Sequence, residues 1–287
     1  MSILIDVNQI AIGILVNNVK DNSDYDMNMI RHTIISRFLD IRAKFAHIYG
    51  DIVLCYDSNT YWRKTVFPNY KGTRKKDREE SSVDWSEVFN ISNVLRDEFK
   101  EFLPFKVLCI QDAEADDIIA SITKYRSFYG YSTLIVSGDK DFKQLQQYEN
   151  VDIYNPQTHE ITKTSPIDAL SYLKEHVIRG DRSDGIPNIL SDDNCLMDKV
   201  RQKPITQKFI AKWMDETKFA ICEKSEQMLY NYNRNEQLID FVHIPNTLIK
   251  DIVNAYKVPV DCNKDTLYQY LDNNRLDSIS KRFSAFI

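Results

Sequence analysis

The sequence predicts an α/β fold in which a mostly parallel central sheet is flanked by helices and followed by a helical C-terminal domain. Through residues 1–179, short apolar runs alternate with segments of helical periodicity. The segments between the runs are long enough to hold crossover helices, so the strands are expected to be parallel. After position 180 the strand signals fade, and polar segments such as 205–230 and 244–256 have helical character. We therefore expect a domain boundary between 1–179 and 180–287.

The first elements are expected to be a strand, a helix and a second strand. Ser2–Ile5 predicts a short buried strand, and the apolar stretch Ile3–Val16 around it suits a strand better than a signal peptide, since no basic residues precede it. Apolar residues then recur at helical spacing from Ile30 until Gly50, where a helix would stop. Ile52–Tyr56 is a short run rich in strand formers.

The remaining α/β part predicts three further strands and three helices. Asp84 and Glu87 match a capping box at the start of one helix, and Pro104 marks its end. Ser165 and Pro166 match the N-cap and first position of another. The expected strands are 105–110, 132–136 and 151–154, and the expected helices are 84–104, 114–129 and 165–178.

Composition and charge exclude several classes of protein. No segment approaches the ~20 uninterrupted apolar residues of a membrane span, so we expect a cytoplasmic protein. Five cysteines without a CxxC pair indicate a reduced compartment and no disulfide framework. The five histidines, His176 among them, show no zinc spacing and are expected to be surface or packing residues. A net charge of −5 excludes a uniformly basic DNA-coating protein.

Acidic residues lie at, or just beyond, the ends of four expected strands: Asp6, Asp57, the cluster 112–117 and Asp139. A single Asp after a strand is most often a turn or N-cap residue. Four in register are harder to explain in that way, because the carboxyl ends of parallel strands share the edge where open α/β sheets bind ligands.

Carboxylates packed at one edge would repel one another unless divalent cations neutralised them. An all-oxygen ligand set favours Mg²⁺, with Mn²⁺ as a substitute. Two such ions, ~4 Å apart, are suited to the hydrolysis of phosphodiesters. The acidic pattern therefore predicts a two-metal hydrolase.

Basic and aromatic residues crowd together at about 58–82, where apolar periodicity disappears. This predicts an exposed, mobile arch, in which cations would neutralise phosphates and aromatic rings would stack on unpaired bases. A solvated basic loop is the alternative. The candidate nucleic-acid-binding residues are Tyr61, Trp62, Arg63, Lys64, Tyr70, Lys71, Arg74, Lys75 and Lys76, together with Arg182.

Short motifs along the chain resemble those of the flap endonuclease and 5′ to 3′ exonuclease family, most closely its T-even bacteriophage members, and they occur in the family's order. The resemblance implies a PIN/FEN-like nuclease fold. The motifs are Leu4-Ile5-Asp6, Tyr56-Asp57, Tyr61-Trp62-Arg63, Tyr70-Lys71-Gly72-Thr73-Arg74, Glu114-Ala115-Asp116-Asp117, Ser137-Gly138-Asp139-Lys140-Asp141 and Gly180-Asp181-Arg182-Ser183-Asp184.

The same resemblance implies the roles of individual residues. Lys71 and Arg74 match the family's basic pair on a helical arch, which contacts the scissile phosphate, and the implied catalytic set is Lys71, Arg74, Asp116 and Asp139. Asp117 and Asp181 are implied as supporting carboxylates. The implied metal ligands are Asp6, Asp57, Glu114 and Asp116 for the first ion, and Asp139, Asp141 and Asp184 for the second.

The resemblance is weaker after the last motif. Family members usually continue into an Asn and a glycine-rich hairpin that binds duplex backbone. Here Gly185 stands in place of that Asn, and 189–194 lacks a second glycine-rich turn. We therefore expect a divergent helix-hairpin-helix within 180–287.

The family resemblance implies a structure-selective 5′ nuclease with 5′ to 3′ exonuclease, flap endonuclease and RNase H-type activity. Such an enzyme would remove RNA primers and 5′ flaps from lagging-strand fragments in DNA replication. Its expected substrates are DNA and RNA/DNA hybrids with 5′ ends, flaps or forks. It is expected to be a monomer that works with single-stranded DNA-binding protein and a sliding clamp.

Two other functions stay open. A PIN-type ribonuclease uses a similar acidic cluster, although it is usually shorter and lacks a basic arch. A non-catalytic protein that binds branched DNA would not need the complete acidic set. Mg²⁺-dependent cleavage of a labelled 5′ flap distinguishes the three.

Overall fold

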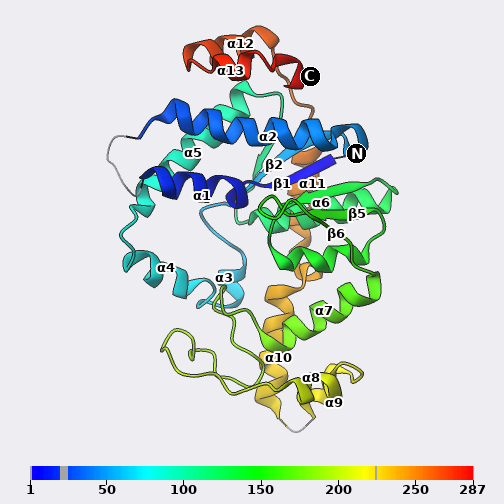
Figure 1. Cartoon of the computed structure of the whole chain (residues 1–287). Helices are drawn as coiled ribbons and strands as arrows, with labels where there is room; N and C mark the ends of the chain where they lie inside the picture. Colours follow the sequence, from blue (N-terminus) through cyan, green and yellow to red (C-terminus); the bar gives the residue numbers. More distant parts are fainter. Residues whose placement is uncertain (1, 20–24, 224, 287) are drawn as a thin grey trace.

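The centre of the molecule is one six-stranded sheet with the strand order β3-β2-β1-β4-β5-β6. The structure is a computed structural model that describes residues 2–19, 25–223 and 225–286 (Figure 1). Strands β1 to β5 are parallel, and β6 is antiparallel to β5, which confirms the expected mostly parallel sheet. The strands are β1 (Ser2–Asp6), β2 (Asp51–Tyr56), β3 (Lys106–Cys109), β4 (Thr133–Val136), β5 (Val151–Tyr154) and β6 (Ile161–Thr162).

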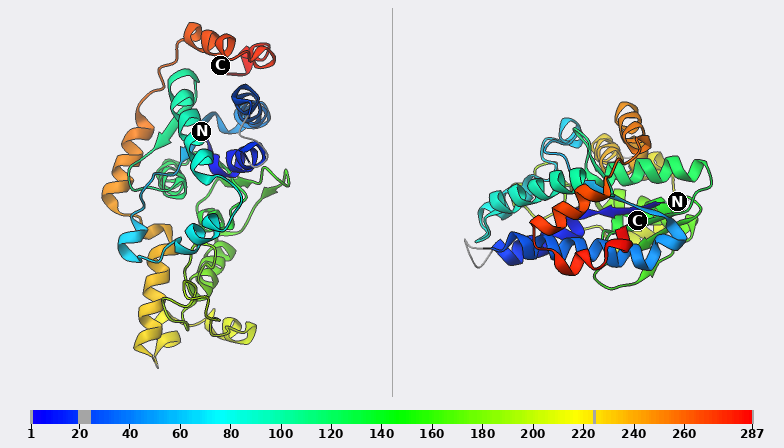
Figure 2. Two further views of the ribbon diagram at one scale, coloured as in Figure 1. Left: turned by 90° about the vertical axis from the view of Figure 1, so that its left-hand side faces the viewer. Right: turned by 90° about the horizontal axis from the view of Figure 1, so that it is seen from above.

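Helices cover both faces of the sheet, and each face has its own hydrophobic cluster. In β1, Ile3 and Ile5 belong to one cluster and Leu4 to the other, because successive side chains of a strand point to opposite faces. The left view of Figure 2 shows the helices of the two faces on opposite sides of the molecule. The first face is covered by α1 (Val7–Val19), α2 (Met27–Tyr49) and α5 (Trp85–Phe102), and the second by α6 (Ala115–Phe128), η1 (Lys140–Gln147) and α11 (Asn246–Lys257).

Helix α1 follows the expected strand directly and was not predicted within the apolar stretch Ile3–Val16. The strand ends at Asp6 and the helix begins at Val7. Val7, Ile10, Ala11 and Leu15 are all buried on the first face. Their spacing of three and four residues is helical, so the signal was present within a run that is apolar almost throughout.

The helix starts behave as their local sequences predict, with one exception. Ser165 caps α7 (Pro166–Arg179) by accepting a hydrogen bond from the amide of Asp168. Asp84 caps α5 by accepting from the amide of Glu87. The reciprocal half of the expected capping box is absent from the described residues, because the Glu87 carboxylate accepts from the Tyr25 hydroxyl instead.

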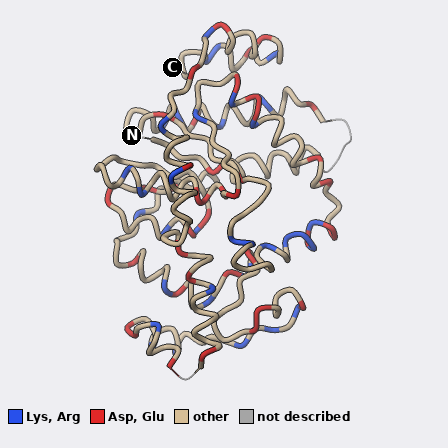
Figure 3. The backbone as a smooth tube through the Cα atoms, turned by 180° about the vertical axis from the view of Figure 1, so that it is seen from behind, with Lys and Arg blue, Asp and Glu red and all other residues tan. Residues whose placement is uncertain are grey.

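The segment expected to form an exposed arch contains two helices and is only partly exposed. They are α3 (Arg63–Val66) and α4 (Gly72–Glu79). Arg63, Phe67 and Tyr70 are buried, which contradicts the expectation of exposure throughout. By contrast, α4 has no buried residue, and Lys and Arg positions gather along it (Figure 3).

The chain after position 180 does not form one separate helical core. Its first part joins α7, Phe67 and Tyr70 in a third cluster, whereas α11 returns to the second face of the sheet and the last helices return to the first face (Figures 1 and 2). No described helix is both long and apolar enough to cross a membrane. The remaining helices are α8 (Gln207–Trp213), α9 (Lys218–Cys222), α10 (Glu226–Ile239), η2 (Phe241–His243), α12 (Lys264–Asn273), α13 (Asp277–Ser280) and η3 (Phe283–Phe286).

Candidate active site at the carboxyl edge of the sheet

Carboxylates from four neighbouring strands meet at the carboxyl edge of the sheet. Asp6 is the last residue of β1, Asp57 follows β2, Asp116 lies in the first turn of α6 after β3, and Asp139 follows β4. They line a cavity of about 140 Å³. Its other charged lining residues are Asp141, Asp181, Asp184, Lys71 and Arg74.

The negative charges in this cavity raise one another's pKa. Burial, and then Asp57 and Asp139, raise the pKa of Asp6 to about 7. Burial, and then Asp139 and Asp6, raise the pKa of Asp116 well above its usual range. No described residue donates a hydrogen bond to the Asp116 carboxylate. This all-oxygen donor set, with too few cations or hydrogen bonds to satisfy it, fits a divalent metal ion.

Short polar contacts fix the orientation of these carboxylates. The Asn8 amide and the Ala115 backbone N–H donate to Asp57 at 2.8 and 2.7 Å. The Ser137 hydroxyl donates to Asp6 at 3.2 Å and accepts from the Asp139 N–H at 3.0 Å. Sequence reasoning did not assign a role to Asn8, although it lies two residues after Asp6.

Glu114 differs from the other expected metal ligands, because it does not line the cavity. Its side chain is 1% exposed and accepts hydrogen bonds from Arg63 Nη1 (2.7 Å), the Tyr70 hydroxyl (2.9 Å) and Lys71 Nζ. Burial alone would raise the pKa of Glu114, but Lys71 and Arg63 outweigh it and the pKa is lowered. Cations already satisfy the Glu114 oxygens in this arrangement, so its role as a ligand of the first ion stays a prediction.

Arg63 and its neighbours support the acidic site from within. Arg63 Nη2 lies 2.8 Å from Asp117 Oδ1, and the indole N–H of Trp62 donates to Asp117 Oδ2 at 3.1 Å. Asp117 also accepts from the backbone N–H of Glu114 and so completes the capping box of α6. Arg63 and Tyr70 were expected to contact nucleic acid, but both are buried and bonded to the carboxylates. A nucleic acid cannot reach them in this conformation.

Lys71 and Arg74 both line the cavity, with Lys71 largely buried and Arg74 partly exposed. Lys71 forms an ion pair with Glu114, and its Nζ lies 4.0 Å from Asp184. Arg74 pairs with Asp184 through Nη2 and donates from Nε to the Ser183 carbonyl at 3.0 Å. Both expected catalytic cations are thus brought to the acidic residues.

The other expected nucleic-acid-binding residues take two positions. Tyr61 is half-buried, with Lys64 and Lys71 ammonium groups near its ring. Four basic residues are exposed: Lys64, Lys75, Lys76 and Arg182.

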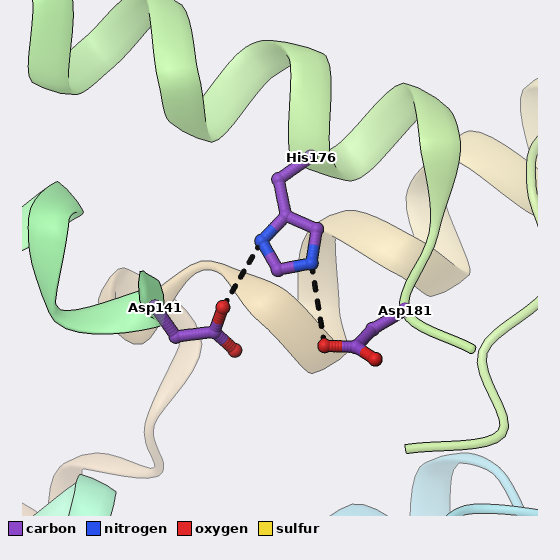
Figure 4. A group of neighbouring side chains, drawn as sticks. All are labelled: Asp141, His176 and Asp181. Atoms are coloured by element: carbon purple, nitrogen blue, oxygen red, sulfur yellow. Dashed lines mark ion pairs between the residues drawn. The ribbon is translucent and has the colours of Figure 1, made fainter. Parts of the chain in front are cut away.

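His176 enters the site from the last turn of α7, and sequence reasoning did not place it there. Its Nδ1 lies 3.3 Å from Asp141 Oδ1, and its Nε2 lies 3.4 Å from Asp181 Oδ2 (Figure 4). These three residues could together hold a metal ion. Among the described residues, they are the one group of three or more His, Cys, Asp or Glu side chains whose ligand atoms all lie within 4.8 Å of one another. His176 lies five residues before Asp181, so a search for His near the Asp-rich motif, rather than near another His, would have found it.

Comparison with known proteins places this geometry in a family. Residues 3–175 match the model of the 5′-3′ exonuclease N-terminal resolvase-like domain, and residues 167–286 match the model of the T4 RNase H C-terminal region. The chain belongs to the 5′-3′ exonuclease family. It is 31% identical over 99% of its length to ribonuclease H of Enterobacteria phage T4, of which it covers 95%.

Solved structures of low sequence identity share the fold. A bacteriophage T5 protein crystallised with metal ions matches 95% of the chain with a TM-score of 0.60 and 17% identity, and 97% of that protein is covered. The T5 flap endonuclease in a complex with DNA and metal ions matches 95% of the chain with a TM-score of 0.56 and 14% identity, again with 97% of that protein covered. The expected nuclease fold is confirmed.

The two family regions meet within α7, and the cavity takes residues from both sides of that helix. Asp6 to Asp141 lie in the exonuclease region, whereas Asp181 and Asp184 lie only in the RNase H region. The acidic site of this 5′-3′ exonuclease family member is therefore complete only when both regions are folded together.

Proposed function

We propose that the chain is a Mg²⁺-dependent, structure-selective 5′ nuclease that hydrolyses phosphodiesters with two metal ions. The observation that carries the proposal is the cavity in which strand-end carboxylates face two cations of the arch, Lys71 and Arg74. The T4 relative is named a ribonuclease H, and the T5 structure is titled a flap endonuclease complex with DNA and metal ions. These names support the same reaction class.

The donor set suggests how two ions would be shared. The carboxylates of Asp6, Asp57, Asp116 and Asp139 come from adjacent strand ends and would hold the first ion. Asp141 and Asp184 line the same cavity and would hold the second, with Asp181 beside them as a supporting carboxylate. When bound, divalent ions lower the pKa of water and offset charge on the leaving oxygen.

The protein's own cations would act on the phosphate. Lys71 and Arg74 already lie against carboxylate oxygens of Glu114 and Asp184. A phosphate that bridges the carboxylate site presents similar anionic oxygens, so these cations are placed to offset charge developing on it. The Tyr70 hydroxyl, 3.0 Å from Asp184, and buried Arg63 would keep the base of the arch in position.

Basic residues around α4 offer a path for the substrate strand. A cavity of about 600 Å³ lies between α4 and residues 195–202, and Lys76, Arg182, Lys199 and Arg201 line it. Phosphate contacts of this kind bind nucleic acid with little dependence on sequence. We expect DNA and RNA/DNA hybrids with 5′ ends, flaps or forks as substrates, and primer and flap removal in the host cytoplasm during DNA replication as the role.

A labelled 5′ flap tests the proposal. We expect cleavage in Mg²⁺, none with a chelator, and products that carry 5′ phosphates. Cleavage of single-stranded RNA alone would favour a PIN-type ribonuclease. Tight flap binding without any cleavage in Mg²⁺ or Mn²⁺ would favour a non-catalytic DNA-binding protein.

A further inference from the structure

The imidazole of His176 is a buried group whose role the reaction scheme above leaves open. Its side chain is 12% exposed, and the Nδ1 atom is fully buried without a hydrogen-bond partner in the described part of the chain. The ring lies between two carboxylates, with Nδ1 toward Asp141 and Nε2 toward Asp181 (Figure 4). Two acidic residues of the cavity are therefore linked through one histidine.

The two contacts are not equivalent. Asp181 also accepts from the backbone N–H and the hydroxyl of Ser183, so its carboxylate is held in place independently of the histidine. It can accept a hydrogen bond from Nε2–H, which leaves Nδ1 as an acceptor with a free lone pair. In its ionised form the Asp141 carboxylate also offers lone pairs, and it accepts no hydrogen bond from any described residue. Two acceptors then face each other at 3.3 Å.

A cation between Nδ1 and Asp141 Oδ1 resolves this opposition. Two ligand atoms that each lie ~2.1 Å from a metal ion, with a right angle at the ion, are ~3 Å apart. This is close to the 3.3 Å between His176 Nδ1 and Asp141 Oδ1. The Asp181 carboxylate behind the ring supplies the partner that metal-bound histidines usually have, because such a partner fixes the tautomer and orients the ring. The alternative is a doubly protonated ring that clamps both carboxylates, and the His176→Lys variant described below distinguishes a clamp from a ligand.

We propose that His176 Nδ1 is a metal ligand, which makes the second metal site a mixed nitrogen and oxygen site. Asp141 is the carboxylate that shares the ion, and Asp181 is the residue that positions the ring. An imidazole ligand favours borderline cations such as Mn²⁺, Co²⁺ or Zn²⁺ over Mg²⁺, which prefers oxygen. The inference rests on the proposed second metal position, and it adds a preference among metals that the carboxylates alone would not produce.

Mn²⁺ bound to the full-length protein is the probe, because pulsed EPR detects hyperfine coupling between Mn²⁺ and a directly bound imidazole ¹⁴N. We expect this coupling in the wild type and in His243→Gln, a control at an exposed histidine. We expect it to be lost in His176→Gln, together with a rise of about 10-fold or more in the Mn²⁺ Kd measured by calorimetry. The Mg²⁺ Kd should change less.

Three results would overturn the inference. One is a wild-type spectrum without ¹⁴N coupling, and another is coupling that persists in His176→Gln. The third is a His176→Lys variant that binds Mn²⁺ like the wild type, since an ammonium can clamp two carboxylates but cannot ligate. If ¹⁴N coupling is absent and Mg²⁺-dependent flap cleavage is normal, this inference fails while the proposed nuclease function stands.

Discussion

Replacing Arg63 by Met tests whether this arginine supports the acidic site or grips nucleic acid. The side chain is 2% exposed, and its guanidinium contacts three acceptors: Glu114 at 2.7 Å, Asp117 at 2.8 Å and the Leu238 carbonyl at 2.8 Å. Met fills a similar volume but leaves two buried carboxylates without this cation. Breaking a buried ion pair by removing one partner costs about 3–5 kcal/mol. We expect Arg63→Met to lower the free energy of unfolding by at least this amount.

Urea unfolding of the metal-free protein measures the loss, and the adjacent residue provides a matched control. Lys64 is exposed and makes no ion pair with a described residue, so Lys64→Met should change the free energy of unfolding by less than about 0.5 kcal/mol. Arg63→Lys should fall between the two, since one ammonium cannot pair with both carboxylates as the planar guanidinium does. If Arg63→Met stays within 1 kcal/mol of the wild type and instead weakens flap binding, the structural role is refuted.

Three further outcomes are expected. Asp116→Asn should abolish flap cleavage in Mg²⁺ but keep flap affinity in a fluorescence anisotropy titration; normal cleavage would place the metal elsewhere. Lys71→Ala should slow the single-turnover rate at saturating flap DNA by about 10²–10³-fold, whereas an unchanged rate would make Lys71 an ordinary phosphate contact. Because the pKa of Asp6 and that of Asp141 are each raised from 3.8 to about 7, the folded state keeps protons that the unfolded state releases between about pH 4 and 7. The melting temperature measured in chelator should therefore fall as the pH rises through this window. Added Mg²⁺ should raise the melting temperature most above pH 7. Equal melting temperatures at pH 5 and pH 8 in chelator would contradict the raised pKa values.

The parts of the fold that the sequence predicts well are those with a strong local period. β1 to β5 are short apolar runs bounded by turn residues, and each lies within a predicted strand or within two residues of one. The helix α1 was missed because its polar positions are few, so its period is hard to see in an apolar run. The two-residue strand β6 pairs with β5 through tertiary contact and carries no period of its own.

The acidic site is predictable to the extent that it follows from strand ends. A parallel sheet brings Asp6, Asp57 and Asp139 together without any further information. Strand ends do not predict that the side chains of Arg63 and Tyr70 are buried, because their burial depends on a third hydrophobic cluster built from distant segments. A basic, aromatic segment looks the same in sequence whether its cations face solvent or buried carboxylates.

The return of the C-terminal helices to the sheet was also beyond local reasoning. Ile252 of α11 packs against α6, and Leu271 of α12 joins the cluster that contains α2 and α5. A truncation at about residue 205 would remove these core side chains, so it would test folding rather than duplex binding. Point substitutions at exposed basic residues such as Lys76 and Arg201 test the proposed substrate path without this complication.

Close packing between the arch and the loop that carries Asp184 explains why Gly185 stands where the family usually has Asn. Gly185 has φ of +72°, a left-handed conformation that favours Gly but that Asn also adopts at some cost, so backbone conformation alone does not exclude Asn. A Cβ atom at this position, however, would lie 3.0 Å from the Asn69 carbonyl oxygen, at the base of the arch. The next bond along the same contact is the 2.7 Å hydrogen bond from the Lys71 N–H to the Asp184 carbonyl. Close approach of the two backbones thus favours a residue without a side chain, and the hydrogen bond joins the Lys71 segment directly to the loop that carries Asp184.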